Sequence, residues 1–221
     1  LAAATVDNVR VVRTLPDGNR FEPGVVIAEL EGTALALLAI ERVMLNLLQH
    51  LSGVATLTHR YVQAIAGTRA RIVDTRKTIP GLRLLQKYAV RVGGGYNHRF
   101  GLSDGILIKN NHISAAGGLR HAVTAARQKG PQTLRVEVEC RTLEDVDAAL
   151  AAGADAVLLD NMVVETLRHA VERVAGKVLT EASGGVTLET VRAIAETGVD
   201  LISVGALTHS AAAVDLHMVL E

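Results

Sequence analysis

From residue 70 onward, short β-branched runs alternate with amphipathic helical patterns, and this alternation limits which folds the chain can adopt. The runs are RIVD, YAVRVGG, GILIK, LRVEVE, AVLLD, VLTEAS and LISVG, and segments such as LEDVDAALAA and VVETLRHAVERVA lie between them. Strands that alternate with helices of this length form βαβ units around a parallel sheet. Seven candidate strands are one fewer than a closed (β/α)8 barrel requires. We therefore predict an α/β fold built on an open seven-stranded barrel.

The first part of the chain has a different rhythm and predicts a smaller α+β domain. VRVVRTL and GVVIAEL are typical of strands, and PDGN between them is a turn sequence. A helical pattern then runs from Glu41 to about Ile65, with apolar residues three and four positions apart. Another face of this helix carries polar and small residues, namely Arg42, Asn46, Gln49 and Gly53. Such a stripe indicates either a solvated side or a contact with a partner or an active site.

These patterns divide the chain into three parts. We expect residues 1–53 to belong to the smaller N-terminal domain and residues 54–207 to form the barrel. We expect residues 208–221 to be a helical segment that packs back on the N-terminal domain.

The composition argues against nucleic acids and membranes as partners. The 23 basic and 23 acidic residues cancel and aromatic residues make up only 2% of the chain, so neither a long-range field nor stacking platforms favour nucleic acid. Apolar stretches such as TALALLAI are shorter than the roughly 20 residues that cross a bilayer. The single cysteine, Cys140, excludes an internal disulfide and is typical of a reducing compartment. We expect a cytoplasmic enzyme.

Nearly every predicted strand ends in a polar residue or a glycine that the strand itself does not need. Along the chain these residues are Arg76 and Lys77, His98 and Arg99, Lys109, Glu139, Asp160, Ser183, Gly184 and Gly185, and Gly205. In parallel α/β folds, ligands bind at the carboxyl edge of the sheet, where connections vary without disturbing the core. The repetition predicts one ligand site at this edge.

Each cation has a structural explanation as well as a functional one. Arg76 and Lys77 could lie in a solvated loop, but Pro80 disfavours helix at Ile79 and predicts a short ordered loop. GGGYNHR could be a hinge, yet glycines also let the backbone approach an anion closely. Lys109 could be an exposed strand end, although a lysine is costly to bury unless it is paired. We favour a ligand-binding function for all of them.

The carboxylates and the glycine turns carry the same ambiguity. Glu137 and Glu139 share one strand face, and we expect Glu139 to function and Glu137 to support it. Asp160 could be only the N-cap of the following helix. EASGG and SVGA could be ordinary turns, but small residues on the last two strands of a barrel are typical phosphate sites. The edge thus predicts an anion among the cations, a metal or sugar hydroxyls near the carboxylates, and a phosphate in the turns.

Several long motifs, in order along the chain, resemble those of the quinolinate phosphoribosyltransferase family, the carboxylating nicotinate-nucleotide pyrophosphorylases. They are DTRKTIPGLR, KYAV, GGGYNHR, LIKNNH, VEVE, LLDN, EASGG and SVGALTHS. The resemblance implies a small sandwich domain joined to an open seven-stranded α/β barrel. It also implies that quinolinate and 5-phosphoribosyl 1-pyrophosphate react, with Mg²⁺, to give nicotinate mononucleotide, pyrophosphate and CO₂ for NAD biosynthesis.

The resemblance implies a role for each matching position. Four side chains would hold the two quinolinate carboxylates: Arg76, His98, Arg99 and Lys109. Lys77 would contact the phosphoribosyl donor, whereas Glu139 and Asp160 would act on ribose hydroxyls and Mg²⁺. The 5-phosphate would be bound by Ser183, Gly184, Gly185 and Gly205. In a head-to-tail homodimer, Arg42 would reach the pocket of the neighbouring subunit. With Lys109, the carboxylates Glu139 and Asp160 are the expected catalytic residues.

Three other interpretations remain open at this point. A lyase or aldolase barrel could use Lys109 for a Schiff base, although it would not need a cluster of arginines. A nicotinate phosphoribosyltransferase would bind a monocarboxylate and need fewer cations. A degenerate barrel could serve assembly alone, against which the complete set of polar residues speaks. Family members usually carry a longer segment before the part that begins at Leu1, and a sandwich domain without it would lack an element.

Overall fold

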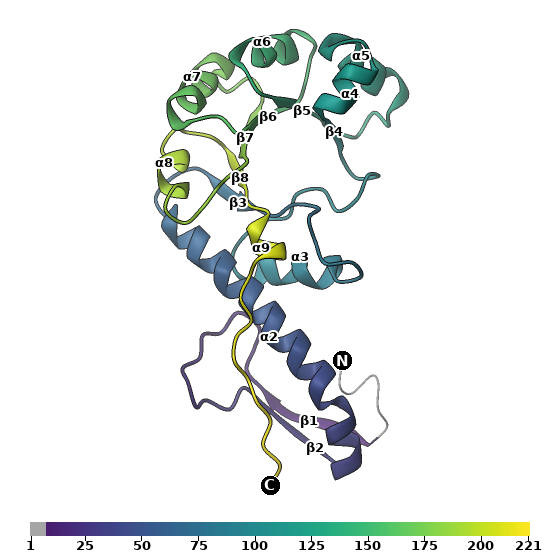
Figure 1. The fold of residues 1–221 in the computed structure, drawn as a ribbon, viewed down its shortest axis with the longest axis vertical. Coiled ribbons are helices and arrows are strands. Elements are labelled where there is room, and N and C mark those ends of the chain that lie inside the picture. The colour runs from purple at the N-terminus through teal and green to yellow at the C-terminus, as the bar shows by residue number, and fades with distance from the viewer. Residues whose placement is uncertain (1–7) are drawn as a thin grey trace.

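A parallel sheet of six strands forms the larger part of the molecule, as seen in the computed structural model, which describes residues 8–221. In space the strands follow the order β3, β8, β7, β6, β5 and β4. Their bounds are β3 Arg71–Val73, β4 Ile106–Ile108, β5 Val136–Cys140, β6 Ala156–Asp160, β7 Leu179–Ser183 and β8 Leu201–Ser203. Figure 1 shows the strands on an arc that stays open between β3 and β4, with helices on the outside. The predicted α/β class and open barrel are confirmed.

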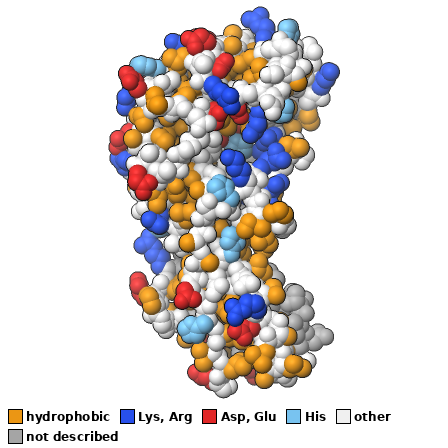
Figure 2. Space-filling model, in the orientation of Figure 1, with side chains coloured by type: hydrophobic (Ala, Val, Ile, Leu, Met, Phe, Trp, Pro, Cys, Tyr) orange, Lys and Arg blue, Asp and Glu red, His pale blue; other side chains and the backbone are white. Residues whose placement is uncertain are grey.

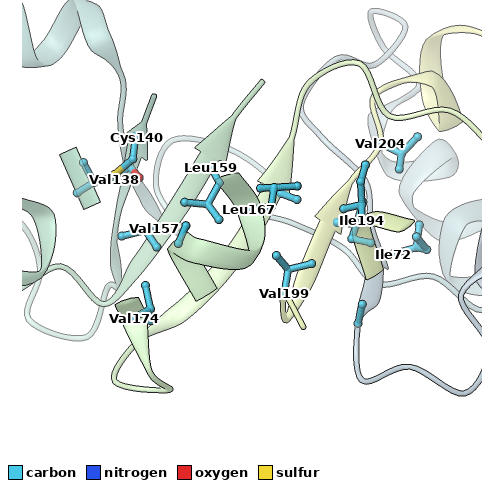
Figure 3. Packing of buried hydrophobic residues seen from close by; sticks show 14 of the residues in the cluster. Ile72, Val138, Cys140, Val157, Leu159, Leu167, Val174, Ile194, Val199 and Val204 are labelled. Carbon is cyan, nitrogen blue, oxygen red and sulfur yellow. Dashed lines mark hydrogen bonds between the residues drawn. The ribbon is translucent and has the colours of Figure 1, made fainter. Parts of the chain in front are cut away.

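Four helices cover the outer face of this arc: α5 Leu119–Lys129, α6 Leu143–Ala151, α7 Val164–Val174 and α8 Val191–Ala195. Each was expected from its apolar periodicity. Their buried residues meet every second residue of the strands, and Figure 3 shows Val157 and Leu159 of β6 beside Leu167 of α7. Because strand side chains alternate between faces, the residues between these, such as Leu158 and Asp160, point to the inside of the arc. The apolar core therefore lies between the sheet and the outer helices, and the inner face of the sheet is available for polar groups.

The run YAVRVGG is helical, so the prediction of a strand there is wrong. It belongs to α3, which spans Arg83–Val92 and buries Gln86, Lys87, Ala89 and Val90 on one face. That spacing has the helical period, which the two valines of the run obscured. The place of a seventh strand is taken by a single parallel bridge between Val73 and Tyr96.

The glycines after α3 also have a different purpose from the one expected. A Cβ on Gly93 would collide with Ala55 O, and one on Gly95 would lie 2.8 Å from the Thr58 side chain. Both contacts are with α2, which spans Ala34–Ala64. These glycines let the chain cross α2 closely on its way to His98, and they do not form a hinge or an anion cradle.

The smaller part consists of a two-stranded antiparallel sheet packed on the first half of α2 (Figure 1). Its strands are β1 Val9–Thr14 and β2 Ala28–Gly32. Its small apolar cluster contains Val9, Ala36, Leu37 and Ile40, with Leu30 and Met218 against it. Thr33 begins the helix, and its hydroxyl accepts a hydrogen bond from Ala36 N.

The C-terminal segment is extended, which corrects the expected helix at 208–221. A short helix, α9, spans Ala206–His209, and residues 211–221 have no regular secondary structure. This segment runs back along α2: Val214 N donates to Gln49 O at 3.0 Å, and Gln49 Nε2 donates to Leu216 O at 2.7 Å. Gly53 has no room for a Cβ because Ala212 O lies against it. Half of the stripe predicted on α2 thus contacts the chain's own C-terminal segment.

By length and composition alone, α2 is apolar enough to cross a membrane, contrary to the estimate from short apolar runs. Within its most apolar window, 22% of the residues are buried. One helix of this kind is weak evidence of a membrane span, since core helices pass the same criteria. Its second half buries Val54, Thr58 and Tyr61 against the barrel, so α2 connects the two parts.

Candidate functional site

A pocket of about 480 Å³ opens on the inner face of the sheet, at the carboxyl ends of the strands. It is lined by all of the residues predicted for the site except Arg42: Arg76, Lys77, His98, Arg99, Lys109, Glu139, Asp160, Ser183, Gly184, Gly185 and Gly205. Residues more than 100 positions apart in the sequence therefore share one cavity. The strand period explains this, because Glu139, Asp160 and Ser183 all lie on the faces that the outer helices do not cover. The individual roles of these residues remain predictions.

Basic side chains gather on one side of this pocket, and Figure 2 shows Lys and Arg side chains clustered on the barrel part. Burial lowers the pKa of Arg99, and the nearby positive charge of Arg76 lowers it further. Arginine keeps its proton even so. The two guanidinium groups therefore repel each other, and a bound anion would relieve that repulsion.

The loop that carries Arg76 and Lys77 is held by hydrogen bonds to neighbouring elements. Thr208 Oγ1 of α9 donates to Lys77 O at 2.7 Å. Gln86, fully buried on α3, accepts from Ile79 N at 2.9 Å and donates to Thr208 O at 2.6 Å. The presence of Pro80 predicted an ordered loop. The hydrogen bonds that hold this loop in place come mostly from side chains of other elements.

A buried ion pair holds the next loop, which carries His98 and Arg99. Lys87 of α3 and Asp74 are both fully buried, and Lys87 Nζ donates to Asp74 Oδ1. Asp74 also accepts from Asn97 Nδ2 at 2.6 Å and from His98 N at 2.9 Å, and Lys87 Nζ donates to His98 O at 3.1 Å. Sequence reasoning missed these residues, although DTRKT, KYAV and YNHR contain them. A lysine on a short helix gave no sign that its charge is buried.

His98 lies between two glutamates of the sheet. Its Nε2 is 3.0 Å from Glu137 Oε2 and 3.3 Å from Glu181 Oε2, while its Nδ1 accepts from Arg99 N at 2.7 Å. Burial lowers the pKa of His98, but the close contacts and charges of Glu137 and Glu181 outweigh it and raise that pKa to about 10. Burial and the charge of Glu137 raise the pKa of Glu181. His98 and Glu181 therefore hold their protons as one cluster.

Glu137 contacts His98, while its expected support of Glu139 stays a prediction, and Glu181 was not singled out from the sequence. It lies two positions before Ser183 on β7, and that spacing places both on the inner face. The alternation of VLTEAS could therefore have revealed it.

Glu139 and Asp160 lie on the neighbouring strands β5 and β6, near the middle of the pocket. Asn110 Nδ2 donates to Glu139 Oε1 at 2.6 Å, and Asn161 Nδ2 donates to Asp160 Oδ1 at 2.9 Å. Arg141 lies across both carboxylates, with Nε 3.3 Å from Asp160 Oδ2 and Nη2 3.8 Å from Glu139 Oε1. Hard oxygen donors on adjacent strands fit Mg²⁺, which commonly takes one or two carboxylates together with substrate phosphates.

The glycine turns close the far side of the pocket. Gly184 and Gly185 both have positive φ, and a Cβ on Gly184 would collide with the Asn161 side chain. Asn161 itself is left-handed, with φ of 56°, and its N–H donates to Ser183 O at 2.8 Å. His209 also lines the pocket, where a Cβ on Gly205 would be 3.1 Å from its Nε2. Neither Asn161 nor His209 was predicted, although LLDN and SVGALTHS contain them.

Arg42 lies outside the pocket of its own chain. It is on the first half of α2, in the smaller part, with its side chain 72% exposed. Large apolar side chains near it along the helix are also exposed, including Leu38 and Val43.

Comparison with protein families matches the chain almost end to end. The C-terminal domain model of quinolinate phosphoribosyl transferase matches residues 54–219, and the N-terminal domain model matches residues 1–52. The boundary falls within α2, close to the expected division after residue 53.

Comparison with individual proteins points to the same family. The chain is 50% identical over 212 residues to a probable carboxylating nicotinate-nucleotide pyrophosphorylase of Bacillus subtilis, covering 96% of this chain and 73% of that protein. It is 50% identical over 214 residues to the carboxylating nicotinate-nucleotide pyrophosphorylase of Mycobacterium leprae, covering 96% and 75%. The chain is also similar to the solved structure of the nicotinate-nucleotide pyrophosphorylase of Francisella tularensis, with 46% identity and a TM-score of 0.90 over 94% of this chain and 74% of that one.

Proposed function

The chain belongs to the quinolinate phosphoribosyltransferase family, and we propose that it acts as the pentosyltransferase of that family. It transfers the phosphoribosyl group of 5-phosphoribosyl 1-pyrophosphate to the ring nitrogen of quinolinate. The acceptor then loses one carboxylate, so that the products are nicotinate mononucleotide, pyrophosphate and CO₂, a step of NAD biosynthesis. The observation that carries this proposal is one pocket that contains clustered cations, two carboxylates and glycine turns.

The cationic side of the pocket suits the acceptor. Quinolinate has two adjacent carboxylates, and the planar guanidinium groups of Arg76 and Arg99 can each bind a carboxylate through two parallel hydrogen bonds. Lys109 adds a positive charge as a flexible point donor. His98 is held in place by Glu137 and by the backbone of Arg99, so its ring offers a fixed contact surface. A monocarboxylate such as nicotinate would leave part of this cation set unpaired.

The opposite side suits the phosphoribosyl donor. The turns at 183–185 and at Gly205 leave backbone and small side chains open toward the pocket, as a 5-phosphate requires. Lys77 would contact the pyrophosphate. Glu139 and Asp160 would bind ribose hydroxyls and hold Mg²⁺, and the bound metal would neutralise charge on the pyrophosphate.

The reaction itself needs little from the protein beyond position and charge. Fixing the ring nitrogen close to the anomeric carbon removes most of the entropic cost of the encounter. As pyrophosphate leaves, positive charge develops on the ribose, and the carboxylates of Glu139 and Asp160 stabilise it. After transfer, CO₂ leaves and its bonding electron pair stays on the ring carbon, where the adjacent positively charged nitrogen stabilises it, and this carbon then takes up a proton. No covalent bond to Lys109 is required.

We further propose that two subunits form a head-to-tail homodimer in which Arg42 enters the pocket of the neighbouring subunit. The support is twofold: Arg42 is exposed, and the surface beside it is apolar. Leu38 and Val43 on α2 are more than half exposed, as is Val12 on β1. An exposed apolar patch rimmed by polar groups is typical of a protein interface. We expect the enzyme to be cytoplasmic, while the names of two plant relatives place those proteins in chloroplasts or mitochondria.

One assay tests the reaction. Purified protein is mixed with Mg²⁺, 5-phosphoribosyl 1-pyrophosphate and quinolinate labelled in the 2-carboxylate, and labelled CO₂ and nicotinate mononucleotide are measured together. We expect equal amounts of both. The same assay with nicotinate in place of quinolinate is the control, since a nicotinate-specific enzyme would form the nucleotide without CO₂. Labelled CO₂ without the nucleotide, or no product from folded dimer, would contradict the proposal.

A further inference from the structure

Glu181 has a buried oxygen with no partner. Its side chain is almost fully enclosed, and Oε2 is the sole buried side-chain polar atom among residues 8–221 without a hydrogen bond. Glu181 nevertheless lines the pocket. A buried polar group is nearly always paired, so this exception needs an explanation. The reaction described above assigns no role to Glu181.

The position of one hydrogen on His98 explains the missing partner. Nδ1 accepts a hydrogen bond from Arg99 N at 2.7 Å, so this nitrogen carries a lone pair and no hydrogen. The ring hydrogen therefore resides on Nε2, and it is donated to Glu137 Oε2 at 3.0 Å. Glu181 Oε2 is 3.3 Å from the same nitrogen but receives no hydrogen bond. The Nε2–H group of His98 thus faces the carboxyl groups of Glu137 and Glu181 and donates a hydrogen bond only to Glu137.

Two ionised carboxylates in this position would be costly. One oxygen of each and Nε2 of His98 lie within 4.8 Å of one another, and all three side chains are largely buried. A metal ion could compensate the charges, but Nε2 carries a hydrogen and is not available as a ligand. The remaining solution is that one carboxyl group keeps its proton, as buried acids near a like charge do. Glu181 is the more deeply buried of the two and lacks the histidine hydrogen bond.

We propose that Glu181 is a positioning residue that works as a neutral carboxylic acid, supporting the ring of His98 while keeping a second negative charge away from the anion-binding side of the pocket. The proposal rests on the proposed function, because it is the anionic acceptor that a second carboxylate would repel. The groups that face Glu181 are His98 from the loop, Glu137 from β5 and the Ser203 hydroxyl from β8, while β6 presents the apolar Leu158.

The direction of the pKa shifts agrees with this arrangement. Burial and the charge of Glu137 raise the pKa of Glu181 above its ordinary value. The raised pKa of His98 describes the same extra proton, since a neutral histidine with a protonated Glu181 holds as many protons as an imidazolium with an ionised one. Because the folded state keeps a proton that the unfolded chain releases near the ordinary pKa of glutamate, the free energy of unfolding should fall as pH rises above that value.

Spectroscopy of the ligand-free enzyme tests the protonation state directly. Infrared spectra at neutral pH should show the carbonyl stretch of a protonated carboxylic acid that disappears in Glu181→Gln and persists in Glu139→Gln, a pocket variant that leaves His98, Glu137 and Glu181 in place. Nitrogen NMR should show His98 as the neutral ring with hydrogen on Nε2. Loss of the band in Glu137→Gln only, an imidazolium signal at neutral pH, or a metal ion that binds stoichiometrically to wild type and not to Glu181→Gln would overturn the proposal.

Kinetics test the positioning role separately. Glu181→Ala removes the side chain packed beside the ring, so His98 is held less precisely and the KM for quinolinate should rise roughly tenfold, with the KM for the phosphoribosyl donor nearly unchanged. Glu181→Gln should recover most of this loss, whereas wild type should lose quinolinate affinity at alkaline pH and Glu181→Gln should not. Melting curves verify that both variants fold. Equal rises in both KM values, or an alkaline loss that persists in Glu181→Gln, would contradict the role.

These measurements separate the two proposals. The infrared and NMR signals need no substrate, so they report on Glu181 even if quinolinate fails to react. A failed reaction with the predicted signals would refute the proposed function alone, and a normal reaction without them would refute this inference alone.

Discussion

The two sides of the pocket are built in different ways. Glu139, Asp160 and Ser183 stand at the ends of sheet strands, where the hydrogen-bond ladder of the sheet fixes their positions. His98 and Arg99 lie on a loop outside the named strands. The buried ion pair between Lys87 and Asp74 fixes the position of this loop. The difference shows that the cationic side depends on side chains that never touch the ligand. Substitutions there should affect folding and acceptor binding together, whereas substitutions on the strand side should affect chemistry or donor binding and leave acceptor binding nearly unchanged.

The largest expected effect is on the buried ion pair. Lys87→Met should lower the free energy of unfolding by roughly 3–5 kcal/mol, because it leaves Asp74 buried without its partner. The double variant Lys87→Met with Asp74→Asn should lose much less, since no unpaired charge remains. Denaturant unfolding measures both. Arg10→Ala, which breaks an exposed pair with Glu31, is the control and should cost less than about 1 kcal/mol. If Lys87→Met were as stable as Arg10→Ala, the buried ion pair would not be what holds the cationic side of the pocket in place.

The glycine turns should show the opposite behaviour. Gly184→Ala places a Cβ against Asn161 on a backbone with φ of 94°. The strain should cost on the order of 1–3 kcal/mol and raise the KM for the phosphoribosyl donor, while quinolinate binding changes little. Gly176→Ala is the control, because it too has positive φ but no neighbour within 4 Å and lies outside the pocket. Steady-state kinetics with each substrate varied in turn distinguishes the two outcomes.

A mixing experiment tests whether the cationic side is completed by a second subunit. Arg42→Ala and Arg99→Ala should each be nearly inactive alone. If subunits exchange, half of the dimers in an equal mixture are hybrids with one intact pocket, so roughly a quarter of the wild-type activity should return. Two variants of the same pocket, Arg76→Ala and Arg99→Ala, give the control mixture and should not recover. Recovery in both mixtures or in neither would contradict the assignment of Arg42.

The smallest effect is expected at Cys140, which lies on the outer face of β5, away from the pocket. Burial and nearby acidic groups raise the pKa of its thiol to about 12, so the reactive thiolate is scarce at neutral pH. Alkylating reagents should leave folded enzyme fully active and label it only after denaturation, as mass spectrometry would show. Labelling with loss of activity in the folded state would place the thiol elsewhere.

The contrast between the two sides also explains what the sequence could predict. Lys109, Glu139 and Asp160 were found because each follows an apolar strand, and strand ends converge at one edge of a parallel sheet. Lys87 was missed because its significance depends on a contact with Asp74, 13 positions away, which no local period reveals. The alternation of VLTEAS places Glu181 on the inner face, but it does not show the contact with His98, 83 positions away. The strand expected at YAVRVGG failed for a related reason. Its valines suit a strand, and only the buried Gln86 and Lys87 before it show the helical face.

Direct titration of quinolinate tests the central claim that one side of the pocket holds the acceptor and the other serves the donor. Calorimetry would compare wild type with Arg99→Ala and Glu139→Gln. We predict that Arg99→Ala loses at least ~3 kcal/mol of binding free energy, the cost of removing one member of a buried charge pair. Glu139→Gln should bind quinolinate as wild type does while its turnover collapses. Wild-type binding by Arg99→Ala, or lost binding in Glu139→Gln, would contradict the account.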